Sequence, residues 1–130
     1  MLLDKLLTFS DGQTVATAVS EHVLDLTDQG DDIHRRLNVF AKVDGGAVAG
    51  GTGLAATLQT SADNSAWGDI ATYPARTLAQ VQADGWIVPP QALPAGLKRY
   101  ARMSYTATGA FTGPGKIVAG ITASLDHKKQ

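Results

Sequence analysis

The sequence predicts an all-β fold: an antiparallel two-sheet sandwich of jelly-roll type with an N-terminal arm. Apolar and polar residues alternate along 101–108 and again along 117–125, with the period of a strand that buries one face. Turn-forming residues recur about every ten positions, as in two-sheet sandwiches and jelly rolls. We therefore expect an arm over residues 1–12 and a single β-sandwich domain over residues 13–130.

The two alternating runs are the organising feature of the chain. They are joined by residues 109–115, in which Gly and Pro supply the backbone angles of turns. This connection is too short for a parallel crossover, so we expect the two strands to pair as an antiparallel hairpin. The apolar sides of the two strands should face the core, with these members: Ala101, Met103, Tyr105, Ala107, Ile117, Ala119, Ile121, Ala123 and Leu125.

Composition excludes several classes of structure and function. The 130 residues include no Cys, so neither disulfides nor thiolate metal sites are available. The formal net charge of −1 argues against broad binding to nucleic acid or to anionic membranes. No apolar run approaches the ~18 residues of a membrane span, and the apolar stretch at residues 1–7 is too short for a signal peptide. We expect a protein assembled inside a cell, without nucleic-acid or membrane partners.

The N-terminal arm carries a large apolar load. Leu2 and Leu6, like Leu3 and Leu7, have the i,i+4 spacing of a single helical turn, which is too short to be stable alone. An apolar terminal segment of this kind must be held somewhere. It either folds back over its own sandwich or docks on a neighbouring subunit. We assign the following residues to subunit contacts: Leu2, Leu3, Leu6, Leu7 and Phe9.

The next stretch should contain a turn, a strand and an acidic loop. Residues 10–12 have the Ser-Asp-Gly composition of a turn, and residues 23–26 form a short strand. Four acids then lie close together, which raises the question of a calcium site: Asp25, Asp28, Asp31 and Asp32. Their spacing fails the EF-hand pattern, because the ligand alternation is broken and no Glu stands at the closing position. We therefore expect a solvated acidic loop and no metal site.

A strand over residues 36–43 and a glycine-rich loop over residues 45–53 follow. Phe40 lies on the polar face of this strand, where it covers a sheet edge or meets a partner. The glycines match letters of a dinucleotide fingerprint and of a P-loop. However, Gly51 stands at the P-loop lysine position, and a strand rather than a helix follows, so no helix N-terminus is available for phosphates. We expect a flexible loop between two strands.

Residues 54–61 and 67–73 should form a second hairpin. Trp67 would then close one end of the core, with its N–H bonded to a loop carbonyl. For residues 74–85 we expect an extended connection, although a short helix also fits the spacing. A short strand at residues 86–88 should precede an irregular proline-rich loop.

No arrangement of residues points to catalysis. The three His residues lack metal-ligand spacing, no Ser lies in a G-x-S-x-G elbow, and the acids concentrate in loops. We therefore predict a protein that is not an enzyme and has no cofactor. Basic residues near the start of the 101–108 run oppose the acidic loop, which favours charge complementarity in protein contacts. The proposed electrostatic partners are Arg99, Arg102, Asp28, Asp31 and Asp32.

Four segments of the chain resemble the jelly-roll capsid cement (decoration) proteins of tailed bacteriophages. They are LLDKLLTFSDGQ (2–13), LQTSADNSAW (58–67), LPAGLKRYARMSYT (93–106) and GKIVAGITA (115–123), and it is their order along the chain that carries the resemblance. The resemblance implies a virion protein of the capsid exterior, assembled in the host cytoplasm, with no catalytic site. It also implies a homo-oligomer, a dimer or a trimer, that bridges subunits of the major capsid protein.

Two other functions fit the same residues. A carbohydrate-binding jelly-roll module is the first alternative, by analogy of fold alone. A tail or head-completion component of a virion is the second. A cement protein should sediment with its own capsids and raise their melting temperature, whereas a carbohydrate-binding module should bind glycans as the isolated protein.

Overall fold

The computed structural model describes residues 8–26 and 37–123, which contain ten β-strands and one short α-helix. The strands are β1 (Thr8–Thr14), β2 (Ala18–Val19), β3 (Leu24–Asp25), β4 (Leu37–Asp44), β5 (Gly53–Ser61), β6 (Gly68–Thr72), β7 (Arg76–Thr77), β8 (Trp86–Ala92), β9 (Tyr100–Thr108) and β10 (Lys116–Ala123). The helix, α2 (Leu78–Asp84), lies between β7 and β8 in the chain.

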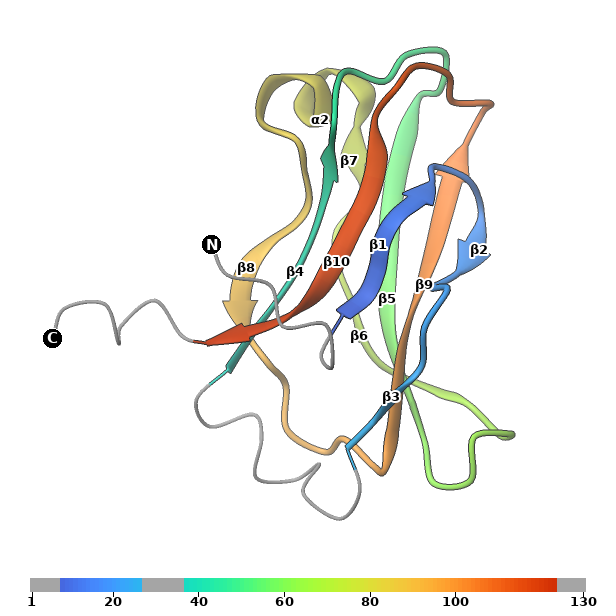
Figure 1. Cartoon of the computed structure of the whole chain (residues 1–130), viewed down its shortest axis with the longest axis vertical. Helices are drawn as coiled ribbons and strands as arrows, with labels where there is room; N and C mark the ends of the chain where they lie inside the picture. Colours follow the sequence, from blue (N-terminus) through green and yellow to red (C-terminus); the bar gives the residue numbers. More distant parts are fainter. Residues whose placement is uncertain (1–7, 27–36, 124–130) are drawn as a thin grey trace, which may run out of the picture.

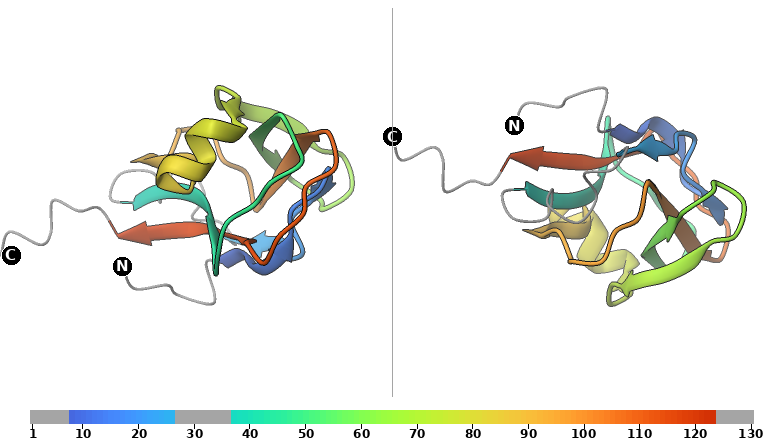
Figure 2. Two further views of the ribbon diagram at one scale, coloured as in Figure 1. Left: turned by 90° about the horizontal axis from the view of Figure 1, so that it is seen from above. Right: turned by 90° about the horizontal axis from the view of Figure 1, so that it is seen from below.

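The strands form two antiparallel sheets that pack against each other (Figure 1, Figure 2). One sheet has four strands in the order β1-β10-β4-β8. The other has six strands, of which four follow the order β2-β9-β5-β6. The remaining two are short: β3 also pairs with β9, and β7 also pairs with β5. The first strand lies next to the last, and most connections cross between the sheets, as in a jelly roll. The predicted all-β two-sheet sandwich is therefore confirmed.

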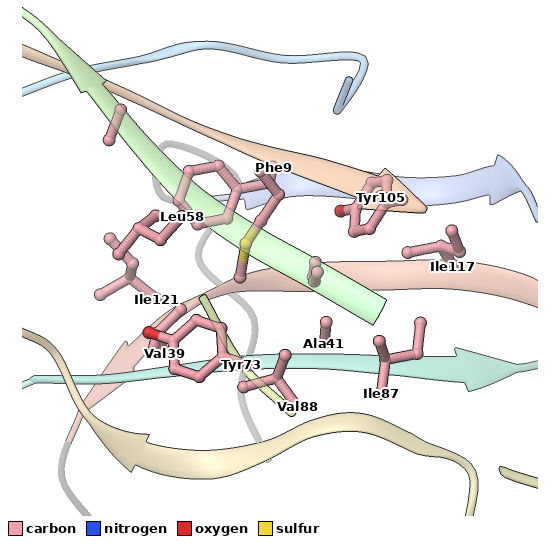
Figure 3. Packing of buried hydrophobic residues seen from close by; sticks show 14 of the residues in the cluster. Phe9, Val39, Ala41, Leu58, Tyr73, Ile87, Val88, Tyr105, Ile117 and Ile121 are labelled. Atoms are coloured by element: carbon pink, nitrogen blue, oxygen red, sulfur yellow. The ribbon is translucent and has the colours of Figure 1, made fainter. Parts of the chain in front are cut away.

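The core fills the space between the two sheets (Figure 3). Phe9 of β1, Val39 of β4 and Ile121 of β10 project from the four-stranded sheet. They pack with Leu58 of β5 and Tyr105 of β9, which project from the opposite sheet, and all five side chains are fully buried. The period-two alternation therefore predicted the buried positions of β9 and β10 correctly from Ala101 to Tyr105 and from Ile117 to Ile121. Ala107 is half-buried, Leu125 lies outside the described residues, and the burial of the Ala123 side chain is not described.

β9 and β10 do not form the predicted hairpin, because they belong to different sheets. β9 pairs with β5 along the whole length of both strands, whereas β10 lies between β1 and β4. The short connection at residues 109–115 thus carries the chain from one layer to the other. The prediction failed because two strands with one buried face show the same alternation whether they lie side by side or face each other across a core.

Two glycine-containing loops pack together at one end of the sandwich. Residues 45–52 join β4 and β5, as predicted for an inter-strand loop, and lie against residues 109–115. Ala49 and Thr112 exchange two backbone N–H···O bonds, of 2.9 and 2.8 Å. The half-buried ring of Phe111 lies directly against Gly51, where a Cβ atom would overlap the ring. The two loops therefore hold each other in place.

The predicted extended connection at residues 74–85 is wrong, because α2 forms there. Thr77 is the N-cap: its hydroxyl accepts the backbone N–H of Gln80 at 3.2 Å, and the Gln80 side chain accepts the N–H of Thr77 at 2.9 Å. This capping box satisfies donors that the first helical turn leaves unpaired. Gly85 ends the helix in the left-handed conformation, with φ of 81°.

In the described chain, the outer strands of both sheets are interrupted or irregular. β8 continues through Pro89 and Pro90, so the prediction that they lie in a loop is wrong. Proline has no backbone N–H to donate, and a strand at the edge of a sheet tolerates it because only one side of that strand is paired. β1 contains two register shifts, and the predicted turn at residues 10–12 is part of this bulged strand. β6 shifts register once, and β2 and β3 are only two residues long. Such edges resist pairing with another sheet.

The sandwich begins before residue 13. β1 starts at Thr8 and pairs with β10, so residues 8–12 belong to the domain rather than to an arm. Phe9 is fully buried in the core of its own chain, and its assignment to a subunit contact is therefore wrong. Burial of the phenyl ring between the two sheets removes its apolar surface from water, which is more favourable in free energy than leaving the ring exposed in a terminal segment.

Candidate protein-binding surface

The outer face of the six-stranded sheet carries a line of polar and aromatic side chains near one end. Arg102 of β9 lies opposite Gln59 of β5 in the strand register. Its Nε donates to Gln59 Oε1 at 2.8 Å, and Gln59 Nε2 donates in turn to Asp69 Oδ1 of β6 at 2.9 Å. The Arg102 guanidinium also lies over the ring of Trp67, 4.3 Å from its centroid. We call these residues, Trp67, Arg102, Gln59 and Asp69, the Trp67–Arg102 cluster.

The turn between β5 and β6 positions Trp67. Asp63 Oδ1 accepts the backbone N–H groups of Ser65 and Ala66 at 2.9 and 3.0 Å. Asn64 occupies the left-handed region at φ 62°, which Asn tolerates better than most residues. The N–H groups of Ala66 and Ser65 are the main causes that lower the pKa of the Asp63 carboxyl below its ordinary value. The charged carboxylate therefore fixes the turn that leads into Trp67.

Arg99 makes a second contact between a guanidinium and an aromatic ring. Its guanidinium lies 5.0 Å from the centroid of the Tyr100 ring, and it donates to the two carboxylate oxygens of Asp25 at 2.9 and 3.0 Å. Tyr100 is two residues before Arg102 on β9, so both project from the same face of the sheet. The Arg99 and Asp25 side chains are 52% and 45% exposed, so this ion pair orients the two groups more than it stabilises the fold.

The structure places the predicted contact residues in different settings. Arg99 immediately precedes β9 and Arg102 lies near its start, and each already interacts with another side chain of the chain. Phe9 lies in the core. The other predicted contact residues lie outside the described residues: Leu2, Leu3, Leu6, Leu7, Asp28, Asp31 and Asp32.

Trp67 does not close the end of the core, as the sequence predicted. It is only partly buried and lies outside the core cluster. Its ring instead supports Arg102 on the surface. The roles of Gln59 and Asp69 were also missed, because they depend on which strands are neighbours in the sheet. The available signal was weaker: Gln59 falls on the outward side of its alternating run, as Arg102 does on its own.

The chemistry of this surface suits protein contacts. Among the described residues, no group of three or more His, Cys, Asp or Glu could hold a metal ion. A cavity of about 30 Å³ beside Val15, Val48 and Phe111 has room for roughly one water molecule. The described parts of the chain contain no helix long and apolar enough to cross a membrane. Trp, Tyr and Arg, which form the surface near Arg102, are the residues enriched at the energetic centres of protein interfaces.

Comparison with known proteins connects the chain to one family. A search of the curated proteins finds no match. A family profile described as Bbp16 matches residues 9–121, which run from the start of β1 into β10 and include the whole Trp67–Arg102 cluster. Because this match covers most of the sequence, the chain belongs to the Bbp16 family.

Proposed function

We propose that this protein is a non-enzymatic virion structural protein, a capsid cement (decoration) protein that binds the outside of the shell and bridges major-capsid subunits. Its partners are the major capsid protein and further copies of itself, as a dimer or a trimer, and neither nucleic acid nor a membrane. It is assembled in the host cytoplasm and acts on the capsid exterior. The leucines of residues 1–7 contribute to the contacts between subunits.

Family membership supports a phage setting for the protein. The name of the Bbp16 family suggests a phage-related protein. The resemblance of four segments to cement proteins, residues 2–13, 58–67, 93–106 and 115–123, supports the narrower role. A protein that binds only the assembled shell stabilises that state by its binding free energy. Many identical sites on one shell make modest individual contacts sufficient.

The Trp67–Arg102 cluster is the observation that carries the proposal. The Trp67 ring and the Gln59 amide hold the Arg102 guanidinium in one orientation. A side chain that is already ordered loses less conformational entropy when a partner binds. A planar guanidinium can donate two parallel hydrogen bonds to a carboxylate of the partner. The cluster is therefore a preformed anchor for another protein.

The irregular sheet edges support binding through such side chains. Bulges in β1 and β6 and the prolines of β8 disfavour pairing with a strand of another protein. The side chains on the outer face of the six-stranded sheet remain available for contact. A capsid subunit would therefore meet side chains of β5, β6 and β9 rather than an open backbone edge.

Sedimentation with undecorated shells of the same phage tests the proposal. The wild-type protein should sediment with the shells and raise their melting temperature. Trp67→Ala and Arg102→Ala should weaken binding by about tenfold or more, as expected for central interface residues. Arg102→Lys keeps the charge but loses the planar stack and should give intermediate binding. Failure of the wild-type protein to bind shells would contradict the cement function.

Arg76→Ala is the matched control for Arg102→Ala. Arg76 also lies on the six-stranded sheet and donates to Asp84 at 2.8 Å, but it pairs near the opposite end of β5. This variant should bind shells as the wild type does. If Arg102→Ala also binds as the wild type does, the Trp67–Arg102 cluster is not the contact surface.

A carbohydrate-binding module is the alternative, and the common face shared by Trp67 and Tyr100 favours it, because sugars stack on aromatic rings. A guanidinium already covers one side of each ring, which limits the stacking area. Binding of the isolated protein to a glycan array, lost in Trp67→Ala, would favour this alternative over the cement function.

A further inference from the structure

Three side chains of the Trp67–Arg102 cluster form a charged row across the outer face of the six-stranded sheet. In the strand register, Gln59 of β5 lies opposite Arg102 of β9 on one side and opposite Asp69 of β6 on the other. The row therefore runs from a cation through a neutral amide to an anion. Neighbouring strands lie about 5 Å apart, so roughly 10 Å separates the backbones at the two charged ends.

The Gln59 amide gives this row a fixed direction. Its oxygen accepts a hydrogen bond from Arg102 Nε at 2.8 Å, and its nitrogen donates to Asp69 Oδ1 at 2.9 Å. Rotation of the amide by half a turn would place its oxygen against the carboxylate and its NH₂ group against the guanidinium, and both bonds would be lost. The Trp67 ring supports the guanidinium as well. Both charges are therefore ordered before a partner binds.

Each charged end of the row keeps the capacity for a further bond. Within the described chain, neither Nη1 and Nη2 of Arg102 nor the second carboxylate oxygen of Asp69 makes a hydrogen bond. Asp69 is exposed and Arg102 is half-buried. A guanidinium whose Nε is occupied can still donate two parallel bonds from Nη1 and Nη2 to a carboxylate. The row thus offers one place for an acid and one for a base.

The order of the charges makes the row complementary to itself. A two-fold axis parallel to β5, midway between two facing sheets, places Arg102 of each copy opposite Asp69 of the other, and Gln59 opposite Gln59. Two sheets that pack face to face keep their strands nearly aligned at about 10 Å, which is the arrangement that such an axis produces. A second copy of this chain therefore carries both charges in the required order.

The remainder of the face allows two copies to approach closely. Beyond the row, the outward positions of β5 and β9 carry short side chains: Ala55, Thr57, Ser104 and Thr106. They alternate with core residues of the same strands, so they face away from the core. Short side chains of this kind do not hold two facing sheets apart. The charged row is therefore free to meet its counterpart.

We propose that two copies of this chain pair face to face through the row of Arg102, Gln59 and Asp69, with Arg102 of each copy bonded to Asp69 of the other. This inference rests on the proposed function, because it assigns a surface to the self-association named there. The same cluster is the proposed shell contact, so a paired copy separates from its partner before it binds the shell through this face. Pairing thus regulates how much of the protein is ready to bind.

Charge reversal in the free protein tests the pairing. Arg102→Asp leaves two anions in the row and Asp69→Arg leaves two cations, so each variant repels its own copy, and the dissociation constant of the pair should rise by about tenfold or more. Lys116→Asp is the control, because it changes the net charge as Arg102→Asp does but lies on the other sheet. Sedimentation velocity over a concentration series measures the constants, and added salt should weaken wild-type pairing. A wild type that does not self-associate, or single variants with the wild-type constant, would overturn the proposal.

A mixture of the two variants identifies a second copy as the occupant. Arg102→Asp and Asp69→Arg chains are complementary at both ends of the row, so they should pair with each other although neither pairs with itself. With one variant isotope-labelled, native mass spectrometry should show mixed pairs in clear excess over like pairs. The double variant, Arg102→Asp with Asp69→Arg, reverses the row and should pair with itself again. Recovery in either case also shows that the single variants had not lost pairing through misfolding.

The opposite results separate this inference from the proposed function. Random mixing of the two variants, or no recovery of pairing, would overturn the proposal in favour of contact with a different protein. Every one of these measurements uses the free protein. Sedimentation with shells, without pairing in solution, would refute the pairing alone, whereas pairing without binding to shells would refute the cement function alone.

Discussion

Two tyrosines of the core, Tyr105 and Tyr73, differ in whether their buried hydroxyl groups have a hydrogen-bond partner. Tyr105 Oη lies 2.8 Å from Ser10 Oγ, and the Ser10 hydroxyl donates to Gln13 Oε1 at 2.6 Å. Tyr73 Oη is buried and has no hydrogen-bond partner among the residues that the structure describes. Burial raises the pKa of Tyr73 to about 12 and also raises the pKa of Tyr105. Burial of a hydroxyl without a partner lowers the stability of the fold, whereas a hydrogen bond compensates for the lost contact with water.

Removal of each hydroxyl should therefore have opposite effects. Tyr73→Phe should leave the free energy of unfolding unchanged or raise it by about 1 kcal/mol, because an unpaired polar group is removed. Tyr105→Phe should lower it by about 1–2 kcal/mol, because the bond to Ser10 is lost. Urea denaturation of the two variants and the wild type measures both changes. A larger loss in Tyr73→Phe than in Tyr105→Phe would contradict this assignment.

The raised pKa of Tyr73 predicts a loss of stability in alkaline solution. The unfolded tyrosine titrates near its ordinary value of 10.0, whereas the folded one titrates at about 12. The folded state therefore keeps its proton longer, so the stabilisation is complete below pH 10 and is lost as the pH rises toward 12. The urea midpoint should fall over this range, and it should fall less in Tyr73→Phe. The same fall in the variant and the wild type would exclude Tyr73 as the source.

At the scale of elements, the contact between the two glycine-containing loops depends on one missing side chain. Gly51 lies directly against the ring of Phe111, and Ala49 and Thr112 bond beside them. The loops connect β4 to β5 and β9 to β10, which are two of the places at this end where the chain changes sheets. Close packing of the loops therefore holds the two sheets together at this end.

Gly51→Ala should disturb this contact. The new methyl group would overlap the Phe111 ring, which must turn outward, and the free energy of unfolding should fall by about 1–3 kcal/mol. Gly68→Ala is the matched control, because no atom lies within 4 Å of the position that its Cβ would take. Thermal unfolding of both variants provides the comparison. In a Phe111→Ala background, Gly51→Ala should cost much less, and an equal cost there would show that the ring is not the obstacle.

The alternation of residues predicted individual strands but not their neighbours. β4, β5, β9 and β10 fall close to the expected ranges, because a half-buried strand leaves a period of two in the sequence. Nothing in that period distinguishes a hairpin partner from a strand in the opposite sheet, which is why β9 and β10 were paired wrongly. The helix α2 has only seven residues, too few for a helical repeat to appear. Thr77 and Gln80 match the capping-box pattern of a helix start, and this pattern in the sequence favoured a helix over the extended connection that was predicted.

The candidate surface was predictable only in part for the same reason. Arg102 was singled out by its charge and by its place on the polar side of a strand. The stacking of Arg102 on Trp67, and the bonds through Gln59 to Asp69, arise from the order β9-β5-β6 in the sheet. A pattern within one strand carries no information on that order.

At the scale of the whole molecule, the irregular edges of the four-stranded sheet limit pairing with strands of other molecules. The prolines of β8 remove backbone donors at one edge of the four-stranded sheet, and the register shifts of β1 distort the other edge. Sheets with such edges do not extend by adding strands from a second molecule. Any contact between copies would therefore be made by side chains rather than by pairing of backbone edges.

Replacement of the β8 prolines should weaken this protection. A double variant, Pro89→Thr with Pro90→Thr, restores two backbone N–H groups in this edge strand and should aggregate faster at equal concentration. Pro74→Thr, in the connection between β6 and β7, is the control and should behave as the wild type does. Light scattering over time at a temperature below unfolding measures the difference. Equal rates for the three proteins would mean that these prolines do not protect the edge.

The central place of β10 also constrains how the molecule is made. β10 lies between β1 and β4, so a nascent chain that has not yet reached Lys116 lacks the middle of one sheet. In that chain β1 has no hydrogen-bonding partner within its sheet, and the apolar face of β4 is open to water. Closure of the jelly roll must wait until the ribosome has released this last described strand. Until then the nascent chain exposes apolar strand faces of the kind that chaperones shield.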